Sequence, residues 1–396
     1  MRTEKLFDES LKKIMLASIK HLSPDSAENL CRPEIIKIAK NCLGFDDILV
    51  PEMSYDKVGV SDYDDFAVEH LIFCSWANVA GAANLYLPKS RKKEEPCPWV
   101  LLCCGHGCGC KLNPVYQAMA QHLARNGIAV LVPDNIGQGE RIAMGHRNEP
   151  APFVARLSFQ TLILYEDCAH IKAALKDSRF DHGKLGAIGN SGGGLTTCFL
   201  SILADDLSVI VSSGYPSTFE FIARKEKEHC CCNILPGVVG RLEMYQIYGC
   251  FTPKPLFLFQ GNEDHYFPQD LFRSTARRVA AAYRDAPGNL ITKVVPGGHS
   301  WDEHRIKISA EFLCRRLNLP PPASDVRMKD NLVEKRNIDQ WLDSYLNTKE
   351  LVRLLTGIDC DLGSIYDIYP EARELKDNTA RAFFSQAKLF TELNGK

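Results

Sequence analysis

Short apolar runs alternate with amphipathic helical patterns between residues 55 and 318. The apolar runs are rich in β-branched residues and end at glycines or polar loops, which is typical of strands. The predicted strands are Glu69–Trp76, Ala83–Leu87, Trp99–Cys104, Ile128–Val132, Leu185–Ile188, Leu207–Ser212, Pro255–Phe259 and Leu290–Val295. The predicted helices are Val115–Asn126, Leu162–Leu175, Gly192–Ala204, Gln269–Tyr283 and Trp301–Leu317.

This alternation predicts an α/β fold with a mostly parallel central sheet flanked by helices. We expect the first two strands to form an antiparallel pair. In parallel sheets the functional groups lie on loops at the carboxyl ends of the strands. The segments rich in glycine and histidine fall at those ends, so we expect the site there.

The two ends of the chain have a different pattern, helical and charged. Residues 1–54 are amphipathic, and residues 319–396 open with three prolines at 320–322, which cannot continue a helix. We therefore expect one core at 55–318, an N-terminal helical extension at 1–54 and a C-terminal one at 319–396. We expect such additions to cap a site, to form a homo-oligomer interface, or to serve only as a helical cover over apolar sheet or helix surface. The N-terminal apolar positions are Phe7, Leu11, Ile14, Met15 and Ile19.

Charge and cysteine content limit the partners and the compartment. The 396 residues include 47 Lys and Arg and 49 Asp and Glu, so nothing in the balance favours nucleic acid or an anionic membrane. No apolar run approaches the roughly 18 residues of a membrane span, and the first residues resemble no signal peptide. There are 16 cysteines, but a chain of this length buries a large core and does not need disulfides for its stability. We expect free thiols in a reducing, cytoplasmic setting.

The most informative stretch is Lys184–Gly194, which contains Gly-x-Ser-x-Gly as Gly189, Ser191 and Gly193. A strand precedes it and a helix follows it, which is the context that this motif requires. The sharp turn lifts the serine oxygen out of the sheet above the helix N-terminus. The pattern predicts Ser191 as a nucleophile.

A serine nucleophile needs a base, and the base needs a carboxylate to orient it. With this type of turn the order along the chain is serine, acid, histidine. Asp264 and His299 follow two consecutive late strands, so their loops should meet at one edge of the sheet. We predict His299 as general base and then acid, and Asp264 as its orienter.

Three neighbouring residues are alternatives for these roles. Glu263 is adjacent to Asp264, but a carboxylate one residue away points elsewhere in the usual geometry. His265 and His304 are alternative bases. His304 falls at least a turn into the helix after His299, where a surface or packing role is expected.

The developing oxyanion needs two backbone donors. The N–H of Gly192, directly after the nucleophile, is the first. The second comes from the loop after an early strand, where Gly105–Cys110 follows Trp99–Cys104. We predict the N–H of Cys108, with Gly109 as the alternative, and expect His106 to brace the loop.

The same loop is dense in soft metal ligands. They are Cys103, Cys104, His106, Cys108 and Cys110, with Cys230, Cys231 and Cys232 further on. Their spacing is not that of paired zinc ligands, and Cys103 and Cys104 should face opposite sides of a buried strand. A small buried apolar role is the simpler interpretation, so we expect no metal.

These residues together resemble the α/β-hydrolase superfamily, in its acetyl xylan esterase-like and dienelactone hydrolase-like branch. The resemblance covers roughly residues 60–317. It implies an α/β-hydrolase catalytic core, ester hydrolysis, commonly of short acyl esters, and neither metal nor organic cofactor. The supporting segments are Gly105–Gly107, Asp134–Arg141, Gly189–Gly194, His229–Gly237, Gly261–Pro268 and Gly297–His299.

We therefore expect a Ser-His-Asp serine hydrolase acting on a small-molecule ester of a carbohydrate-like or natural-product alcohol. A peptidase, a lactonase or a carbon–carbon bond hydrolase stays open, because the fold does not choose among them. A non-catalytic binding protein is the alternative from another class. Four aromatic residues between the predicted strand Leu207–Ser212 and the acid loop belong either to the pocket or to the core: Phe219, Phe221, Tyr245 and Tyr248.

Overall fold

The computed structural model describes most of the predicted core and a short part of each extension. The described residues are 30–45, 50–76, 79–90, 95–107, 109–146, 151–155, 157–224, 231–233, 235, 238, 240–323, 325–326 and 346–358. The predicted helical positions between Phe7 and Ile19 lie outside them, as does the predicted oxyanion donor Cys108. Cys230 and most of the stretch from His229 to Gly237 lie outside them as well.

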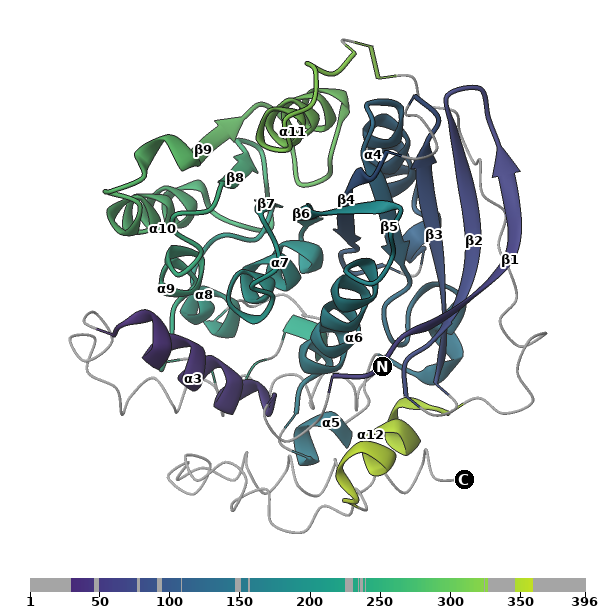
Figure 1. Cartoon of the computed structure of the whole chain (residues 1–396). Helices are drawn as coiled ribbons and strands as arrows, with labels where there is room; N and C mark the ends of the chain where they lie inside the picture. The colour runs from purple at the N-terminus through teal and green to yellow at the C-terminus, as the bar shows by residue number, and fades with distance from the viewer. Residues whose placement is uncertain are drawn as a thin grey trace.

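The described strands form one sheet in the order β1-β2-β3-β5-β4-β6-β7-β8-β9 (Figure 1). β1, β2, β3 and β5 are joined by antiparallel pairings, and β5-β4-β6-β7-β8-β9 run parallel. The mostly parallel α/β architecture and the antiparallel pairing of the first two predicted strands are thereby confirmed. The strands are β1 Ser54–Asp62, β2 Phe66–Cys74, β3 Ala80–Pro88, β4 Cys97–Cys103, β5 Ala129–Pro133, β6 Phe180–Asn190, β7 Val209–Ser213, β8 Leu256–Gly261 and β9 Leu290–Val295.

Helices cover both faces of this sheet. α4 and α11 pack on one face, and α6, α7 and α10 contribute to the core on the other (Figure 1). Short 3-10 turns, η1 Cys110–Leu112, η2 Gly139–Met144, η3 Cys231–Asn233 and η4 Pro287–Asn289, link the elements. The helices are α3 Arg32–Leu43, α4 Pro114–Arg125, α5 Ala151–Val154, α6 Phe159–Ala174, α7 Gly192–Leu203, α8 Phe219–Arg224, α9 Met244–Gly249, α10 Gln269–Ala282, α11 Glu303–Arg316 and α12 Thr348–Thr356.

Strand β4 shows why a continuous apolar run belongs in the middle of the sheet. Trp99, Leu101 and Cys103 belong to the core on the α6 side, whereas Val100 and Leu102 belong to the core on the α4 side. A strand buried on both faces has no polar position in its alternation. The periodicity along the sequence therefore located β4 well.

The described parts of both extensions pack on the same core. Ile35, Ala39 and Leu43 of α3 are buried in the core on the α6 side. Leu351 and Val352 of α12 join that core beside α5. Among the described residues, no helix is both long and apolar enough to span a bilayer.

Candidate active site

Ser191 occupies a sharp turn between β6 and α7. Its backbone angles, φ 60° and ψ −124°, lie outside the regions that residues with a side chain ordinarily adopt. A Cβ atom on Gly189 would come within 2.1 Å of Gly193 O, and one on Gly193 within 2.0 Å of Cys103 O. The turn therefore closes only with glycine at both positions, which is the physical reason for the Gly-x-Ser-x-Gly spacing.

Asp264 and His299 meet at the carboxyl ends of β8 and β9. His299 Nδ1 lies 2.8 Å from Asp264 Oδ2, and the Asp264 side chain is fully buried while that of His299 is 20% exposed. The backbone N–H groups of Tyr266 and Phe267 donate to Asp264 Oδ1 at 2.8 and 3.2 Å. Both carboxylate oxygens are therefore occupied, and Nε2 is the histidine nitrogen left for chemistry.

Arg305 fixes the loop that carries His299. This guanidinium is buried in α11 and donates to Pro296 O at 2.9 Å and to Ser300 O. Gly261 sits beneath the same loop, where a Cβ atom would come within 2.2 Å of Gly298 O. The loop is thus held from both ends by groups that are distant in sequence.

A hydrogen-bonded chain ties the nucleophile turn to the His299 loop. Trp301 Nε1 donates to Ser213 Oγ at 2.8 Å, and Ser213 Oγ donates to Asn190 Oδ1 at 2.8 Å. Asn190 Nδ2 then donates to the carbonyl of His299 at 3.1 Å. Because Asn190 precedes Ser191, this chain sets the histidine loop against the nucleophile.

Gly214 leaves room for the histidine ring. Its φ is +60°, and a Cβ atom there would lie 3.2 Å from His299 Cε1 and 2.6 Å from Asn190 Oδ1. Sequence reasoning missed Gly214, Asn190, Ser213 and Arg305. The only signal for Gly214 was a glycine at the carboxyl end of a strand.

The loop after β4 lies against the nucleophile turn, as predicted for an oxyanion hole. A Cβ atom on Gly105 would lie 3.2 Å from Ser191 Cβ, and one on Gly192 would lie 3.1 Å from His106 N. Tyr116 Oη accepts the Gly105 N–H at 2.7 Å. The contact supports a donor from this loop beside Gly192. Cys108 lies outside the described residues, so its role stays a prediction.

A buried ion network supports the end of that loop. Lys111 Nζ lies 2.8 Å from Asp134 Oδ2 and 2.6 Å from Glu140 Oε1, and all three side chains are almost fully buried. Burial by itself lowers the pKa of Lys111, but the two carboxylates outweigh it and raise that pKa. The Asp134–Arg141 segment therefore has a structural role beneath η1.

Aromatic rings surround His299 on one side. Tyr266 and Phe267 place their ring centroids 4.7 and 5.7 Å from that of His299, and Phe221 lies 6.2 Å from Phe267. Phe267 therefore lies between Phe221 and His299, the predicted base. Tyr248, by contrast, is fully buried and donates to Gly194 O at 3.1 Å, so it belongs to the core.

The alternative acid and bases are placed differently. Glu263, His265 and His304 are all exposed. Asp264 is the carboxylate that contacts His299 Nδ1. The geometry therefore favours Asp264 and His299 over each alternative.

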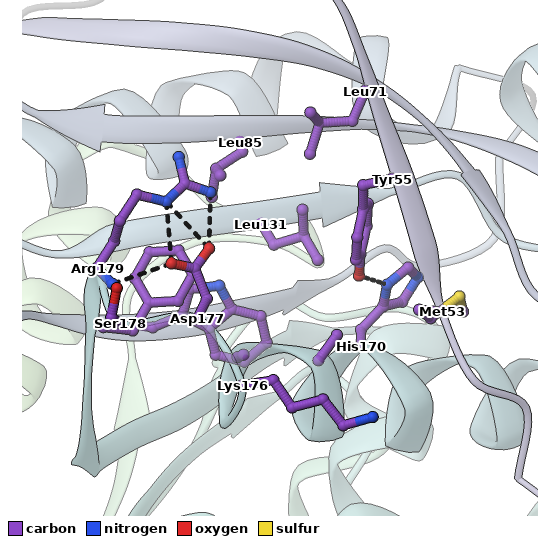
Figure 2. A pocket seen from close by; sticks show the side chains of 14 residues that line it. Met53, Tyr55, Leu71, Leu85, Leu131, His170, Lys176, Asp177, Ser178 and Arg179 are labelled. Atoms are coloured by element: carbon purple, nitrogen blue, oxygen red, sulfur yellow. Dashed lines mark hydrogen bonds and ion pairs between the residues drawn. The ribbon is translucent and has the colours of Figure 1, made fainter.

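Figure 2 shows a cavity of about 440 Å³, whose lining includes none of Ser191, Asp264 and His299. Its lining includes Trp99 and Phe180, near the amino ends of β4 and β6, whereas Ser191 follows the carboxyl end of β6. Tyr55 Oη and His170 Nδ1 are 2.5 Å apart in its wall, and burial lowers the pKa of His170 to about 3. A neutral histidine bound to a tyrosine is a core pair, and we assign this cavity no catalytic role.

The cysteines near the site behave mostly as small apolar residues. Cys103 and Cys104 are buried in the cores on opposite faces of the sheet, as expected. Burial raises the pKa of both thiols, which keeps them protonated. His106, His146 and Cys232 instead approach one another beside the loop after β4.

Comparisons with known proteins establish the fold. No protein-family model and no curated sequence matches the chain. Among solved structures, Methylesterase BT1017 aligns with a TM-score of 0.60 at 16% identity, over 99% of this chain and 77% of that one. A glucuronoyl esterase from Solibacter usitatus aligns with a TM-score of 0.55 at 12% identity, over 74% of this chain and 94% of that one.

Acetyl Xylan Esterase 1 from Thermoanaerobacterium sp. JW/SL YS485 gives a TM-score of 0.52 at 15% identity, over 73% of this chain and 96% of that one. At sequence identities of 12–16%, the similarity to these structures shows a shared fold. The chain has the α/β-hydrolase fold, so the fold that the sequence motifs predicted is confirmed.

Proposed function

We propose that this protein is a serine hydrolase that cleaves carboxylic esters through an acyl-enzyme. The observation that carries the proposal is the pairing of His299 with a fully buried Asp264 beside a serine held at positive φ. Triad chemistry uses an acid held in a fixed orientation, as Asp264 is by hydrogen bonds to both of its oxygens. It also uses a nucleophile raised on a glycine-flanked turn.

The steps follow from this arrangement. His299 Nε2 takes the proton from Ser191 as the hydroxyl oxygen attacks the ester carbonyl. The N–H of Gly192 and a donor from the loop after β4, predicted as Cys108, hold the oxyanion. His299 returns the proton to the departing alcohol. It then activates a water molecule, which attacks the acyl-enzyme. This step releases the carboxylic acid product and regenerates Ser191.

The proposed substrate is a short acyl or methyl ester of a carbohydrate-like or natural-product compound. Solved structures with this fold include a methylesterase, glucuronoyl esterases and acetyl xylan esterases. A peptidase, lactonase or carbon–carbon bond hydrolase would use the same triad. A panel of ester, amide, lactone and diketone substrates distinguishes the four reaction types.

Fluorophosphonate labelling tests the proposal without knowledge of the natural substrate. We expect one adduct, on the peptide that contains Ser191, and no adduct in Ser191→Ala. Asp264→Asn should slow labelling because an amide favours the wrong tautomer of His299 and no longer stabilises its protonated form. An unlabelled wild-type protein, or an adduct on another serine, would refute the assignment.

A further inference from the structure

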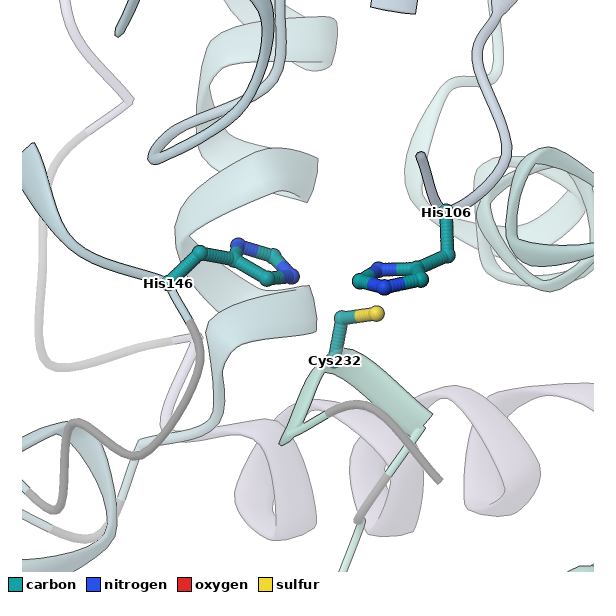
Figure 3. A group of neighbouring side chains, drawn as sticks. All are labelled: His106, His146 and Cys232. Carbon is teal, nitrogen blue, oxygen red and sulfur yellow. The ribbon is translucent and has the colours of Figure 1, made fainter. Parts of the chain in front are cut away.

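His106, His146 and Cys232 form a cluster beside the loop that meets the nucleophile turn. Their ligand atoms all lie within 4.8 Å of one another. The side chains converge from three segments: the loop after β4, the segment after η2, and η3 (Figure 3). Sequence reasoning considered His106 and Cys232 separately as metal ligands. It had no signal for His146, which follows a different strand.

His146 is oriented as a metal ligand is. Its Nδ1 lies 2.8 Å from Ile136 O, and since a carbonyl only accepts, Nδ1 carries the proton. Nε2 of the neutral ring therefore carries a lone pair. It accepts the Gln138 amide N–H at 3.1 Å, so a metal ion bound here takes the place of this hydrogen bond. A backbone carbonyl that fixes the tautomer in this way is the usual outer partner of a ligating histidine. Phe159 packs on the ring, with centroids 4.8 Å apart.

A buried polar atom beside His146 lacks a partner. Gln138 Nε2 lies 3.1 Å from His146 Nε2, while Gln138 Oε1 is buried and, among the described residues, makes no hydrogen bond. A buried acceptor without a donor is destabilising, so its presence needs a cause. A water bound to a metal at this cluster would be such a donor.

The donor set selects the type of metal. Two imidazole nitrogens and one thiolate suit Zn²⁺ and disfavour Mg²⁺ and Ca²⁺, which prefer oxygen. Three protein ligands leave a fourth position for water. Cys232 and His146 are buried, at 3% and 5% exposure, and His106 is exposed, so the cluster is open to solvent on one side.

We propose that His106, His146 and Cys232 bind one Zn²⁺ ion, which clamps the loop after β4 to the segment after η2 and to η3. The separations of up to 4.8 Å require closure of the three ligands around the ion. His106 lies between two glycines, so it is the ligand best able to move. The backbone nitrogen of His106 lies close to Gly192. The bound ion therefore acts on the part of the loop after β4 that contacts the Ser191 turn.

Cobalt substitution tests the site independently of hydrolysis. Chelator-treated protein is titrated with Co²⁺, and absorption is recorded. We expect one equivalent to give the thiolate-to-cobalt charge-transfer band and the visible bands of a tetrahedral ion, and Zn²⁺ to displace it. Cys232→Ser should lose the charge-transfer band. His146→Gln should weaken Co²⁺ binding about 10- to 100-fold or more.

Cys250→Ser is the matched control, since Cys250 is a buried cysteine outside the cluster. It should keep both the band and the affinity. Thermal melting of each metal-free variant separates loss of binding from loss of folding. A wild-type protein without the band, or a Cys232→Ser variant that retains it, would overturn the proposal. Because fluorophosphonate labelling of Ser191 needs no metal, failure of either proposal leaves the other standing.

Discussion

Gly214 shows how closely the proposed catalytic residues depend on single backbone positions. It contributes no functional group, yet its missing side chain is the space that His299 and Asn190 occupy. Its positive φ adds a second reason for glycine, because an L side chain is strained there.

We expect Gly214→Ala to lower kcat by at least tenfold and to cost about 1–3 kcal/mol of stability. The added methyl group displaces the imidazole from Ser191, and misplacement of about 1 Å costs up to about 100-fold in rate. Steady-state kinetics and urea unfolding measure the two effects. Gly288→Ala is the control, because a Cβ atom at Gly288 meets no atom within 4 Å. Equal rates for both variants would contradict the role of Gly214.

Among single residues, the sequence indicated the proposed reacting groups more readily than the groups that position them. Ser191, Asp264 and His299 each follow a recognisable strand, and their order along the chain limits the choice. Asn190, Ser213 and Trp301 form their hydrogen-bonded chain only when strands distant in sequence become neighbours. No local pattern encodes such a contact.

At the scale of elements, Glu243 joins two short helices. It precedes α9, and its carboxylate accepts the N–H of Phe219 at 2.9 Å and that of Glu220 at 3.4 Å, at the start of α8. Burial raises its pKa to about 7, although these hydrogen bonds act in the opposite direction. The carboxyl group therefore binds its proton more tightly in the folded state than in the unfolded state.

This shift makes stability depend on pH. The unfolded pKa is 4.5, so the free energy of unfolding should fall as pH rises from 4.5 to 7, by on the order of 3 kcal/mol in total. Glu243→Gln should remove this component. Urea unfolding at pH 5 and pH 8 measures the difference, with exposed Glu311→Gln as control. A Glu243→Gln variant as pH-dependent as the wild type would contradict the interpretation.

The strands followed the hydrophobic patterning where apolar residues stand in a run, as they do even in the edge strand β9. Strand β1 was missed, because all of its residues are exposed or half-buried and only Tyr55, Val58 and Val60 among them are apolar. A strand of this kind carries a weak alternation of polar and apolar residues. Its place becomes clear only from the antiparallel pairing of Ser54–Asp62 with β2.

At the scale of the whole molecule, α12 belongs to the folded core although it lies far along the chain from α11. Leu351 and Val352 are fully buried, and Thr348 Oγ1 donates to Gly145 O at 2.6 Å. That carbonyl precedes His146, so the C-terminal helix also supports the proposed zinc cluster. The sequence predicted a helical extension, but no pattern in it specified the surface that α12 covers.

We expect Leu351→Ala to destabilise the protein by about 2–5 kcal/mol, because it leaves a cavity in the main core. Leu354→Ala, on the same helix but 51% exposed, should change stability by less than about 0.5 kcal/mol. Chemical unfolding of the two variants measures the contrast. Equal stabilities would show that α12 is not docked on the core.

The role of Ser191 is tested by the rate of p-nitrophenyl acetate hydrolysis, measured for wild type and for Ser191→Ala after unfolding curves have shown both to be folded. We expect Ser191→Ala to lower kcat by about four to six orders of magnitude, with only oxyanion-hole and binding effects remaining. Equal hydrolysis by the two proteins would contradict this role.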